Sequence, residues 1–408
     1  MTDSRSFVIV GAGMAGARAA EELRARGFGG RVTLLGEERV RPYDRVPLSK
    51  HYLRFEPGFH PLFIHEEDYY AAHDIDLRLD TRAASIDVDR RQLTLESGQR
   101  LDYDELLLAT GSRLRHLRVP GSNLDGVHYL RRMSDADRLR STLTEVGRIV
   151  VIGAGFIGSE VAASARQLGV EVAMVGSGQL PMERALGSEI AAFYRDVHYD
   201  HGVKLHLGVP VEALRGGFRV EEVLLADGTT LAADAVVVGI GAQPRVDLAR
   251  TADIALDNGI VTDERMATRA PGIHAAGDVA AAWHPALGRR LRLEHWFSAR
   301  HQGPVAARNM LGMPTVYDRV PFLFTDQYDV WMEYTGYSSE GADLVLRGDP
   351  AAGEAAEFVA FWVRDSKLVA GMNVNLKGLP DAIAAIVASG RRIDPVALAD
   401  PDVDLADL

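Results

Sequence analysis

The 408 residues are enough for two or three domains with hydrophobic cores of their own, and a content of 47% hydrophobic and 25% charged residues is ordinary for a globular protein. A formal net charge of -12 disfavours nucleic acid and anionic membrane surfaces as partners, because both carry the same sign. The chain has no cysteine, which excludes disulfide exchange, thiolate-bound metals and iron–sulfur clusters within it, so redox chemistry would need bound organic cofactors.

We expect neither a secretory signal nor a membrane-spanning helix in this sequence. Residues 1–6 do not have the apolar core or the cleavage site of a secretory signal, and the apolar run at 235–242 is far shorter than the ~20 residues that span a bilayer. We therefore expect a soluble, cytoplasmic protein that binds neither nucleic acid nor a membrane.

The first motif is a glycine-rich turn between an apolar strand and an alanine-rich helix. Residues 8–23 read VIVGAGMAGARAAEEL, with glycines at Gly11, Gly13 and Gly16. In such a turn the first glycine permits a tight bend, the second lets the backbone approach a pyrophosphate, and the third lets the helix pack on the strand. The helix N-terminus then holds the phosphate charge. The pattern predicts a dinucleotide-binding unit, with a tight turn that binds no ligand as the alternative.

An acidic turn follows at the distance that this motif requires. The second strand, expected at 32–35, ends at Gly36, Glu37 and Glu38, roughly 20 residues past the glycines. Glu37 is the candidate ligand for the ribose hydroxyls. The alternatives are Glu38 in that role, or a solvated acidic turn.

The motif is repeated in the middle of the chain. Residues 150–165 read VVIGAGFIGSEVAASA and place Gly153, Gly155 and Gly158 on the same spacing, which predicts a second dinucleotide-binding unit. Glu160 is expected in the first turn of the helix that follows, where it could pair with Lys50 or simply complement the helix dipole.

The remaining segments complete an α/β architecture. Short strands are expected over 75–110, a return to the first domain over 260–280, a strand at 357–363 and a helix near 379–389. We expect two Rossmann-like dinucleotide-binding domains and a C-terminal α/β domain. The expected limits are 1–112 and 241–321 for a first, discontinuous dinucleotide-binding domain, 113–240 for the second and 322–408 for the C-terminal domain.

Several motifs resemble one family over nearly the whole chain. The chain resembles the FAD-dependent NAD(P)H:ferredoxin reductases of putidaredoxin-reductase type, which belong to the flavoproteins with two dinucleotide-binding domains and a glutathione-reductase-like fold. The motifs are PYDRVPLSK (42–50), ATG (109–111), GD (277–278), EHWFSARHQG (294–303), PFLFTDQYD (321–329), LVLRGDP (344–350) and the tail at 394–408.

The resemblance implies a set of cofactor-binding residues. For FAD these are Gly11, Gly13, Ala15, Gly16, Glu37, Arg45, Lys50, Ala83, Arg131, Gly277, Asp278 and Trp296. For NAD they are Gly153, Gly155, Ile157, Gly158, Glu160 and Gly241. Lys50 and Glu160 are the implied catalytic residues.

Four of these assignments have alternatives. Lys50 would approach the isoalloxazine ring, where a cation stabilises the anionic reduced flavin, but a lysine before a helix is often a solvated charge. Asp278 would bind the ribityl chain, or act as a helix N-cap, or do both. Trp296 would lie beside the flavin or be a core aromatic residue, and Arg131 could be a surface arginine.

The resemblance implies that NADH reduces FAD and that FAD passes electrons to a small [2Fe-2S] ferredoxin serving a cytochrome P450 or another oxygenase. A rubredoxin as the acceptor, direct transfer to oxygen or a quinone, and an NADH-binding redox sensor like apoptosis-inducing factor are the alternatives. The cysteine pair of a disulfide reductase is absent. The histidines lack the spacing of metal ligands, so no metal is expected.

Three positions depart from the family pattern: Val46 replaces a proline, Phe324 a frequent tryptophan, and Gly176 an acid that is frequent in NAD-binding units. We expect NADH as the electron donor, with NADPH as the alternative that Ser177 or Arg184 would tolerate.

Two arginine-rich runs are candidates for docking an acidic partner, with solvated loops as the alternative. They are Arg113, Arg115 and Arg118, and Arg289, Arg290 and Arg292.

Overall fold

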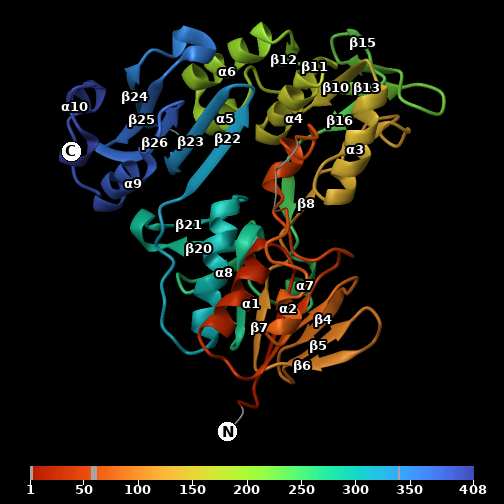
Figure 1. The fold of residues 1–408 in the computed structure, drawn as a ribbon, viewed down its shortest axis with the longest axis vertical. Coiled ribbons are helices and arrows are strands. Elements are labelled where there is room, and N and C mark those ends of the chain that lie inside the picture. Colours follow the sequence, from red (N-terminus) through yellow and green to blue (C-terminus); the bar gives the residue numbers. More distant parts are fainter. Residues whose placement is uncertain (1–2, 57–61, 339–340) are drawn as a thin grey trace. The chain divides into compact units, whose positions relative to one another are not determined.

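The computed structural model describes residues 3–56, 62–338 and 341–408, which form two compact units (Figure 1). Unit 1 comprises Met1–Asp44, Pro61–Arg113 and Gln243–Pro321. Unit 2 comprises Arg45–His60, Leu114–Ala242 and Phe322–Leu408. Residues 322–408 thus belong to the same unit as the central residues, and the three ligand-defined domains with their limits stay a prediction.

Unit 1 is built on a parallel five-stranded sheet in the order β19-β7-β1-β2-β3. Its three central strands consist mostly of valine, isoleucine, leucine and phenylalanine, as expected where both faces of a parallel sheet are buried. The bounds are β1 (Ser6–Val10), β2 (Arg31–Leu35), β3 (Ile75–Arg78), β7 (Glu105–Leu108) and β19 (Ile273–Ala275).

Helices and two small sheets surround this sheet. Helix α1 (Met14–Ala25) packs on α8 (Trp296–Met310) so closely that a methyl group at Gly303 would stand 2.2 Å from the carbonyl oxygen of Ala15. The small sheets are β4 (Ala83–Asp87), β5 (Gln92–Leu95) and β6 (Arg100–Asp102), and β18 (Ile260–Thr262), β20 (Ala280–His284) and β21 (Arg289–Leu291). Two short helices, α2 (Tyr69–Ala72) and α7 (Asp247–Arg250), complete this unit.

Unit 2 contains a second parallel five-stranded sheet, in the order β12-β11-β10-β16-β9. Its bounds are β9 (Val127–Tyr129), β10 (Arg148–Ile152), β11 (Glu171–Gly176), β12 (Lys204–Leu207) and β16 (Ala235–Val238). A three-stranded sheet accompanies it, with β13 (Val211–Arg215), β14 (Glu222–Leu225) and β15 (Thr230–Ala232). Its helices are α3 (Met133–Glu145), α4 (Phe156–Gln167), α5 (Glu183–Leu186) and α6 (Ser188–Asp200).

The C-terminal part of unit 2 is an antiparallel sheet in the order β22-β23-β26-β25-β24, drawn in blue in Figure 1. Its bounds are β22 (Phe322–Gln327), β23 (Val330–Gly336), β24 (Asp343–Gly348), β25 (Phe358–Arg364) and β26 (Lys367–Val374). Helices α9 (Pro380–Ser389) and α10 (Pro395–Ala399) follow, and one apolar core joins this sheet to α5 and α6. The strand expected at 357–363 and the helix expected near 379–389 are confirmed.

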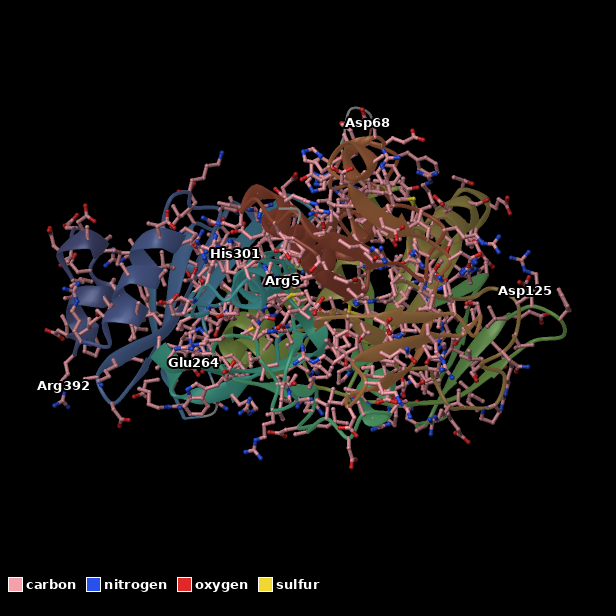
Figure 2. All side chains as sticks on the ribbon, turned by 90° about the horizontal axis from the view of Figure 1, so that it is seen from below. Arg5, Asp68, Asp125, Glu264, His301 and Arg392 are labelled. Atoms are coloured by element: carbon pink, nitrogen blue, oxygen red, sulfur yellow. The ribbon has the colours of Figure 1, made fainter. Side chains whose placement is uncertain are left out.

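Two of the boundaries between the units fall within short strands, β8 (Ser112–Leu114) and β17 (Ala242–Pro244). Charged side chains of both signs cover the surface, among them Asp68 of unit 1 and Asp125 and Arg392 of unit 2 (Figure 2). Within the described residues, no helix combines the length and the apolar character that crossing a membrane requires.

Candidate functional site

The two glycine-rich turns have the same construction. Gly11 has φ +118° and Gly153 has φ +111°, values that side chains rarely tolerate. A methyl group would stand 2.1 Å from the carbonyl oxygen of Ala109 in the first turn and 2.3 Å from that of Gly239 in the second. Each turn therefore crosses over the end of a neighbouring strand, β7 in unit 1 and β16 in unit 2.

The third glycine of each turn lets the helix lie close to the strand. A methyl group at Gly16 would stand 1.9 Å from the carbonyl oxygen of Gly11, and one at Gly158 would stand 1.9 Å from that of Gly153. Glycine is required at both positions by packing alone.

The second glycine is different, because the protein itself does not require it. A methyl group at Gly13 or Gly155 would meet no described atom within 4 Å. Both residues are N-caps with extended backbone, and in the described part of the chain no side chain caps either helix. Each helix therefore presents backbone N–H groups to an open cradle, which fits the pyrophosphate of a dinucleotide.

The second turn carries exposed apolar side chains beside its glycines. Ile157, in the first turn of α4, is 46% exposed, and Ile240 is 37% exposed. Gly241 follows with φ +94°. In the glycine-rich turn of unit 1, by contrast, Ala15 is buried against α8. The structure thus places Ile157 and Gly241 at the predicted NAD turn, and gives Ala15 a packing role whether or not it touches FAD.

The two acidic residues after β2 have different partners. Glu37 forms ion pairs with Arg245 and, at 3.8 Å, with the Nε atom of Arg82. Glu38 accepts a hydrogen bond of 2.7 Å from the hydroxyl of Tyr43. Glu37 is therefore not a simply solvated acid. No pattern in the sequence pointed to Arg245, which lies 208 residues from Glu37 in the chain.

Asp278 belongs to the GD motif, and Trp296 belongs to the EHW motif at the start of α8. The 3₁₀ helix η2 (Gly277–Val279) has Ala276 as its N-cap, so the interpretation of Asp278 as an N-cap is wrong. The Ser112 hydroxyl donates a hydrogen bond of 3.3 Å to the Asp278 carboxylate. Trp296 is half-buried at the first position of α8, with the Arg300 guanidinium 4.9 Å from its ring, and is not a fully buried core residue.

Two further predicted FAD ligands meet in unit 2. The Arg45 guanidinium donates to the carbonyl oxygen of Arg131 at 2.7 Å. The backbone N–H of Arg131 donates to the Asp135 carboxylate, which caps α3. This contact brings two positions together that are 86 residues apart. Ala83 begins β4 in unit 1 and is half-buried.

Lys50 and Glu160 form a buried ion pair, which was one of the two alternatives that the sequence left open for Glu160. The Lys50 Nζ atom lies 2.7 Å from Glu160 Oε1, and each residue is only 3% exposed. Lys50 ends the 3₁₀ helix η1 (Val46–Ser49), and Phe324 lies under its ammonium group, 5.5 Å from Nζ to the ring centre. The interpretation of Lys50 as a solvated charge is therefore wrong.

The position of Glu160 in its helix also differs from the expectation. Helix α4 begins at Phe156, which makes Glu160 its fifth residue and places it beyond the first turn. Its carboxylate is held by side chains rather than by the helix N-terminus. The Ser49 hydroxyl donates to Oε2 at 2.5 Å, and the Thr325 hydroxyl donates to Oε1 at 2.7 Å.

A chain of buried polar groups continues from Thr325. The Gln327 amide donates to the Thr325 hydroxyl at 3.3 Å, and His198 Nε2 lies 2.9 Å from Gln327 Oε1. The sequence analysis assigned no role to Ser49, Thr325, Gln327 or His198. Thr325 and Gln327 were visible as polar residues two apart on one face of an apolar strand, which is a weak signal.

The position in unit 2 that matches Glu37 is Ser177. Val10 pairs with Leu35 in unit 1 as Ile152 pairs with Val175 in unit 2, so Gly176 corresponds to Gly36. A methyl group at Gly176 would stand 3.1 Å from Ala154 Cβ and 3.2 Å from Leu207 Cδ2. Packing against these side chains accounts for glycine at this position, while Ser177 is exposed.

The second arginine run is largely occupied by contacts within unit 1. Arg290 donates to the backbone carbonyls of Thr262 and Ala281. Arg292, whose side chain is 13% exposed, pairs with Glu294 at 2.6 Å. Arg290 and Arg292 therefore stabilise the fold, while Arg289 is exposed. Docking of a partner by this run stays a prediction.

In the first run, Arg113 pairs with Asp247 at 3.0 Å, and the Arg115 Nε atom donates to the carbonyl oxygen of Ala242 at 3.2 Å. Arg115 and Arg118 are exposed. These two residues of unit 2 remain docking candidates.

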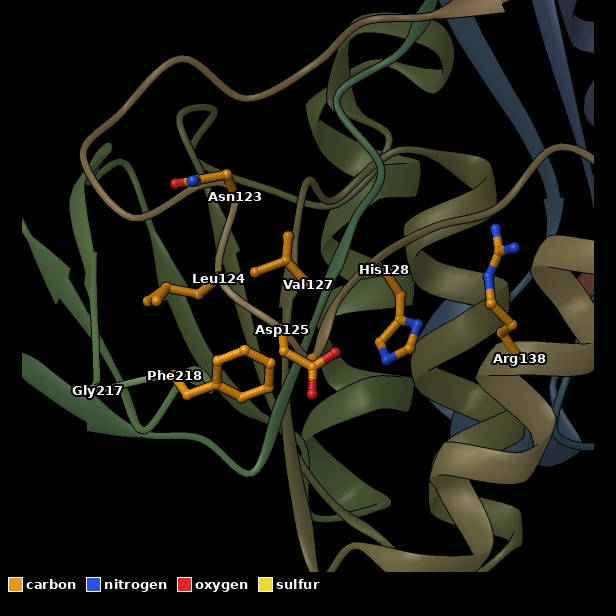
Figure 3. Close-up of a pocket in the computed structure, with 9 residues that line it drawn as sticks. Asn123, Leu124, Asp125, Val127, His128, Arg138, Gly217 and Phe218 are labelled. Atoms are coloured by element: carbon orange, nitrogen blue, oxygen red, sulfur yellow. The ribbon is translucent and has the colours of Figure 1, made fainter.

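A surface pocket of about 590 Å³ in unit 2 contains none of the predicted site residues (Figure 3). Its charged side chains already have partners: Asp125 pairs with Arg219 at 3.5 Å and Arg138 with Asp135 at 2.6 Å. Across residues 3–56, 62–338 and 341–408, no three or more His, Asp or Glu side chains are grouped to hold a metal ion, and the expectation of no metal stays a prediction.

Comparison with known proteins identifies relatives over the whole chain. The family model for pyridine nucleotide-disulphide oxidoreductases matches residues 5–303, and the reductase C-terminal model matches residues 322–408. The ferredoxin–NAD(+) reductase component of an anthranilate 1,2-dioxygenase system from Burkholderia cepacia is 40% identical, over 98% of both chains. Rhodocoxin reductase from Rhodococcus erythropolis is 38% identical, over 98% of this chain and 93% of that protein.

A solved structure is similarly close. The covalent complex of putidaredoxin reductase with putidaredoxin aligns with a TM-score of 0.95 and 34% identity, covering 99% of this chain and 98% of that one. Sequence and structure comparisons therefore agree on the relationship.

The open cradles predict that the second glycines serve ligands. Gly13→Ala should leave the protein folded, because a methyl group there meets no described atom within 4 Å, but weaken FAD binding at least tenfold, about 1.4 kcal/mol. Gly155→Ala should do the same for NAD⁺ and leave FAD in place. Gly29→Ala, in an equally open loop, is the control. FAD content and NAD⁺ titration calorimetry measure the effects, and equal affinities in all three variants would contradict the assignment.

Burial of His198 predicts a pH-dependent stability. Burial lowers the pKa of this fully buried histidine to about 4, although its hydrogen bond to Gln327 opposes the shift. An unfolded histidine takes up its proton near pH 6.5, so the unfolded chain binds more protons between pH 6.5 and 4. The contribution of neutral His198 to the free energy of unfolding is complete above pH 6.5. It is lost as the pH falls toward 4, by about 3 kcal/mol in total.

His198→Gln keeps a donor near the Nε2 position and removes this proton uptake. Its thermal midpoint should therefore fall less steeply than that of the wild type between pH 6.5 and 4.5, and the two profiles should run parallel from pH 7 to 8. Equal slopes at low pH would show that His198 is not buried in its neutral form.

Proposed function

Because the chain belongs to the pyridine nucleotide-disulphide oxidoreductase family, we propose that it is an FAD-dependent enzyme that transfers electrons from NADH to a small [2Fe-2S] ferredoxin. The observation that carries this proposal is the pair of glycine-rich turns, in each of which the second glycine is required by no atom of the described protein. Two open cradles suit two dinucleotides, one in each unit.

The proposed division of labour follows the two units. FAD is bound by the first turn with Glu37 at its ribose, and NADH by the second turn with Ile157 and Gly241 beside it. The remaining residues that we assign to FAD are Arg45, Lys50, Ala83, Arg131, Gly277, Asp278 and Trp296. FAD, when bound, accepts two electrons as a hydride and releases them one at a time.

The protein's own part is electrostatic and positional. Lys50 supplies a fixed cation that favours an anionic reduced ring, and Glu160 holds that cation in place at 2.7 Å. The chain has no cysteine, so the dithiol step of a disulfide reductase is not available to it.

The names of the relatives support the class of partner. The Burkholderia relative is the reductase component of a dioxygenase system, and the solved relative is joined to putidaredoxin. We propose a ferredoxin that serves a cytochrome P450 or another oxygenase, with a rubredoxin as the alternative acceptor. Arg115 and Arg118 are the proposed docking residues, and the cytoplasm is the proposed location.

The proposed electron donor is NADH. Ser177, at the position of Glu37 in the second unit, offers a hydroxyl rather than a carboxylate, so it repels a 2′-phosphate less than an acid would. We therefore propose weak discrimination, with NADPH accepted at lower efficiency. The specificity constants for the two nucleotides should differ by less than a hundredfold.

The purified protein should be yellow, release FAD on heating and lose its flavin absorbance when NADH is added without oxygen. With added ferredoxin it should then reduce cytochrome c at a rate that depends on the ferredoxin concentration. Fast ferredoxin-dependent turnover supports the reductase, whereas slow reduction without turnover supports the alternative of a redox sensor. A colourless protein that FAD cannot reconstitute would refute both.

Lys50→Met should keep FAD but slow its reduction by NADH at least tenfold, because the cation is lost. It should also destabilise the protein, since removing one partner of a buried ion pair costs about 3 to 5 kcal/mol. Lys50→Met with Glu160→Gln removes the unpaired charge and should recover the thermal midpoint but not the reduction rate. Stopped-flow absorbance measures the rate, and an unchanged rate in the folded double variant would remove Lys50 from the catalytic residues.

A further inference from the structure

The carboxylate of Glu160 is held from three sides within unit 2. Oε1 is 2.7 Å from Lys50 Nζ and also accepts from the Thr325 hydroxyl at 2.7 Å, while Oε2 accepts from Ser49 at 2.5 Å. Ser49 and Lys50 come from η1, Glu160 from α4, and Thr325 from β22 of the C-terminal sheet. A carboxylate that is 3% exposed needs such donors, because burial without them costs several kcal/mol.

The hydroxyl of Thr325 has a single proton, and its surroundings direct this proton to Glu160. Thr325 is fully buried, and its oxygen receives the Gln327 amide at 3.3 Å, so its own proton is directed at Glu160. Its branched Cβ also restricts rotation of the side chain. The hydroxyl is therefore a fixed donor rather than one that reorients freely.

The orientation of Gln327 depends in turn on His198. Gln327 Oε1 can only accept a hydrogen bond, so His198 Nε2, at 2.9 Å, must carry a proton. Burial lowers the pKa of His198 to about 4, so the ring is neutral near pH 7 and its Nδ1 is an acceptor for the Tyr328 hydroxyl at 3.2 Å. The tautomer of His198 is thereby specified.

The protons along this chain all point the same way. Tyr328 donates to His198, His198 to Gln327, Gln327 to Thr325 and Thr325 to Glu160. A row of aligned donors ending on a carboxylate stabilises its charged form and fixes its position more firmly than one isolated hydroxyl would.

We propose that Thr325 is a positioning residue for the Lys50–Glu160 pair, and that Gln327 and His198 set the direction of its hydroxyl. This inference rests on the proposed function, since it gives the C-terminal segment a part in placing the cation that assists flavin reduction. Thr325 acts through Glu160 and is not itself assigned a contact with FAD or NADH.

The test compares Thr325→Val, which keeps the shape and removes the hydroxyl, with Thr325→Ser, which keeps the hydroxyl. Thr335→Val is the matched control, because Thr335 is also buried in the C-terminal sheet and its hydroxyl has no hydrogen-bond partner among the described residues. We expect Thr325→Val to slow flavin reduction at saturating NADH at least fivefold with NADH affinity within twofold. Thr325→Ser should recover most of the rate.

A second readout does not depend on turnover. If Lys50 is less well placed, the reduced flavin is less stabilised, so the midpoint potential of bound FAD should move to a more negative value in Thr325→Val and stay unchanged in Thr335→Val. Spectroelectrochemistry measures this shift. Wild-type potential and wild-type reduction in a folded Thr325→Val variant would overturn the inference.

A double-mutant cycle tests whether Thr325 acts through Glu160. In a Glu160→Gln background, Thr325→Val should have less than half of its effect on the rate, whereas an independent structural effect would add in full. If Thr325→Val does not fold, Gln327→Met, which removes the amide at similar length, takes its place with the same expected results. Wild-type protein that fails to bind FAD or oxidise NADH would refute the proposed function instead, before any variant is compared.

Discussion

Two opposite charges inside unit 2, Lys50 and Glu160, impose the strictest condition on how this unit is assembled. Each is 3% exposed, and neither could remain charged there alone, because the loss of hydration would exceed the gain from packing. The pair is satisfied by donors from η1 and β22 as well as by its own contact of 2.7 Å. Three separate stretches of chain must therefore be in place together, and the C-terminal residues belong to the same unit as the central ones.

The glycine-rich turns meet a different condition, which concerns the backbone. In both units the first and third glycines are required because a methyl group would stand 1.9 to 2.3 Å from a carbonyl oxygen. Only the second glycine lies against open space, at Gly13 and Gly155. The structure thus divides a motif of three glycines into two residues that build the turn and one that lies against open space. We propose that this second glycine serves the ligand.

Features that depend on local sequence could be predicted, whereas those that depend on distant contacts could not. The turns and several of the strands followed from local motifs, whereas the pairing of Lys50 with Glu160 was only one of two alternatives. Thr325 meets Glu160 across 165 residues and His198 meets Gln327 across 129, and no spacing in the sequence encodes those contacts. The strand register that equates Gly176 with Gly36 likewise appears only in the paired strands.

Glu37 and Glu160 illustrate how burial decides what one residue type can do. Glu37 is 26% exposed at its side chain and pairs with Arg245 and Arg82, so it can exchange these partners for ribose hydroxyls at modest cost. Glu160 cannot exchange partners in this way, because the loss of any of its donors would leave a buried charge unsatisfied. The partly exposed acid is thus suited to exchange its protein partners for a bound ligand. The buried acid is suited to hold a neighbouring cation still, which is the property that a group assisting a repeated reaction must have.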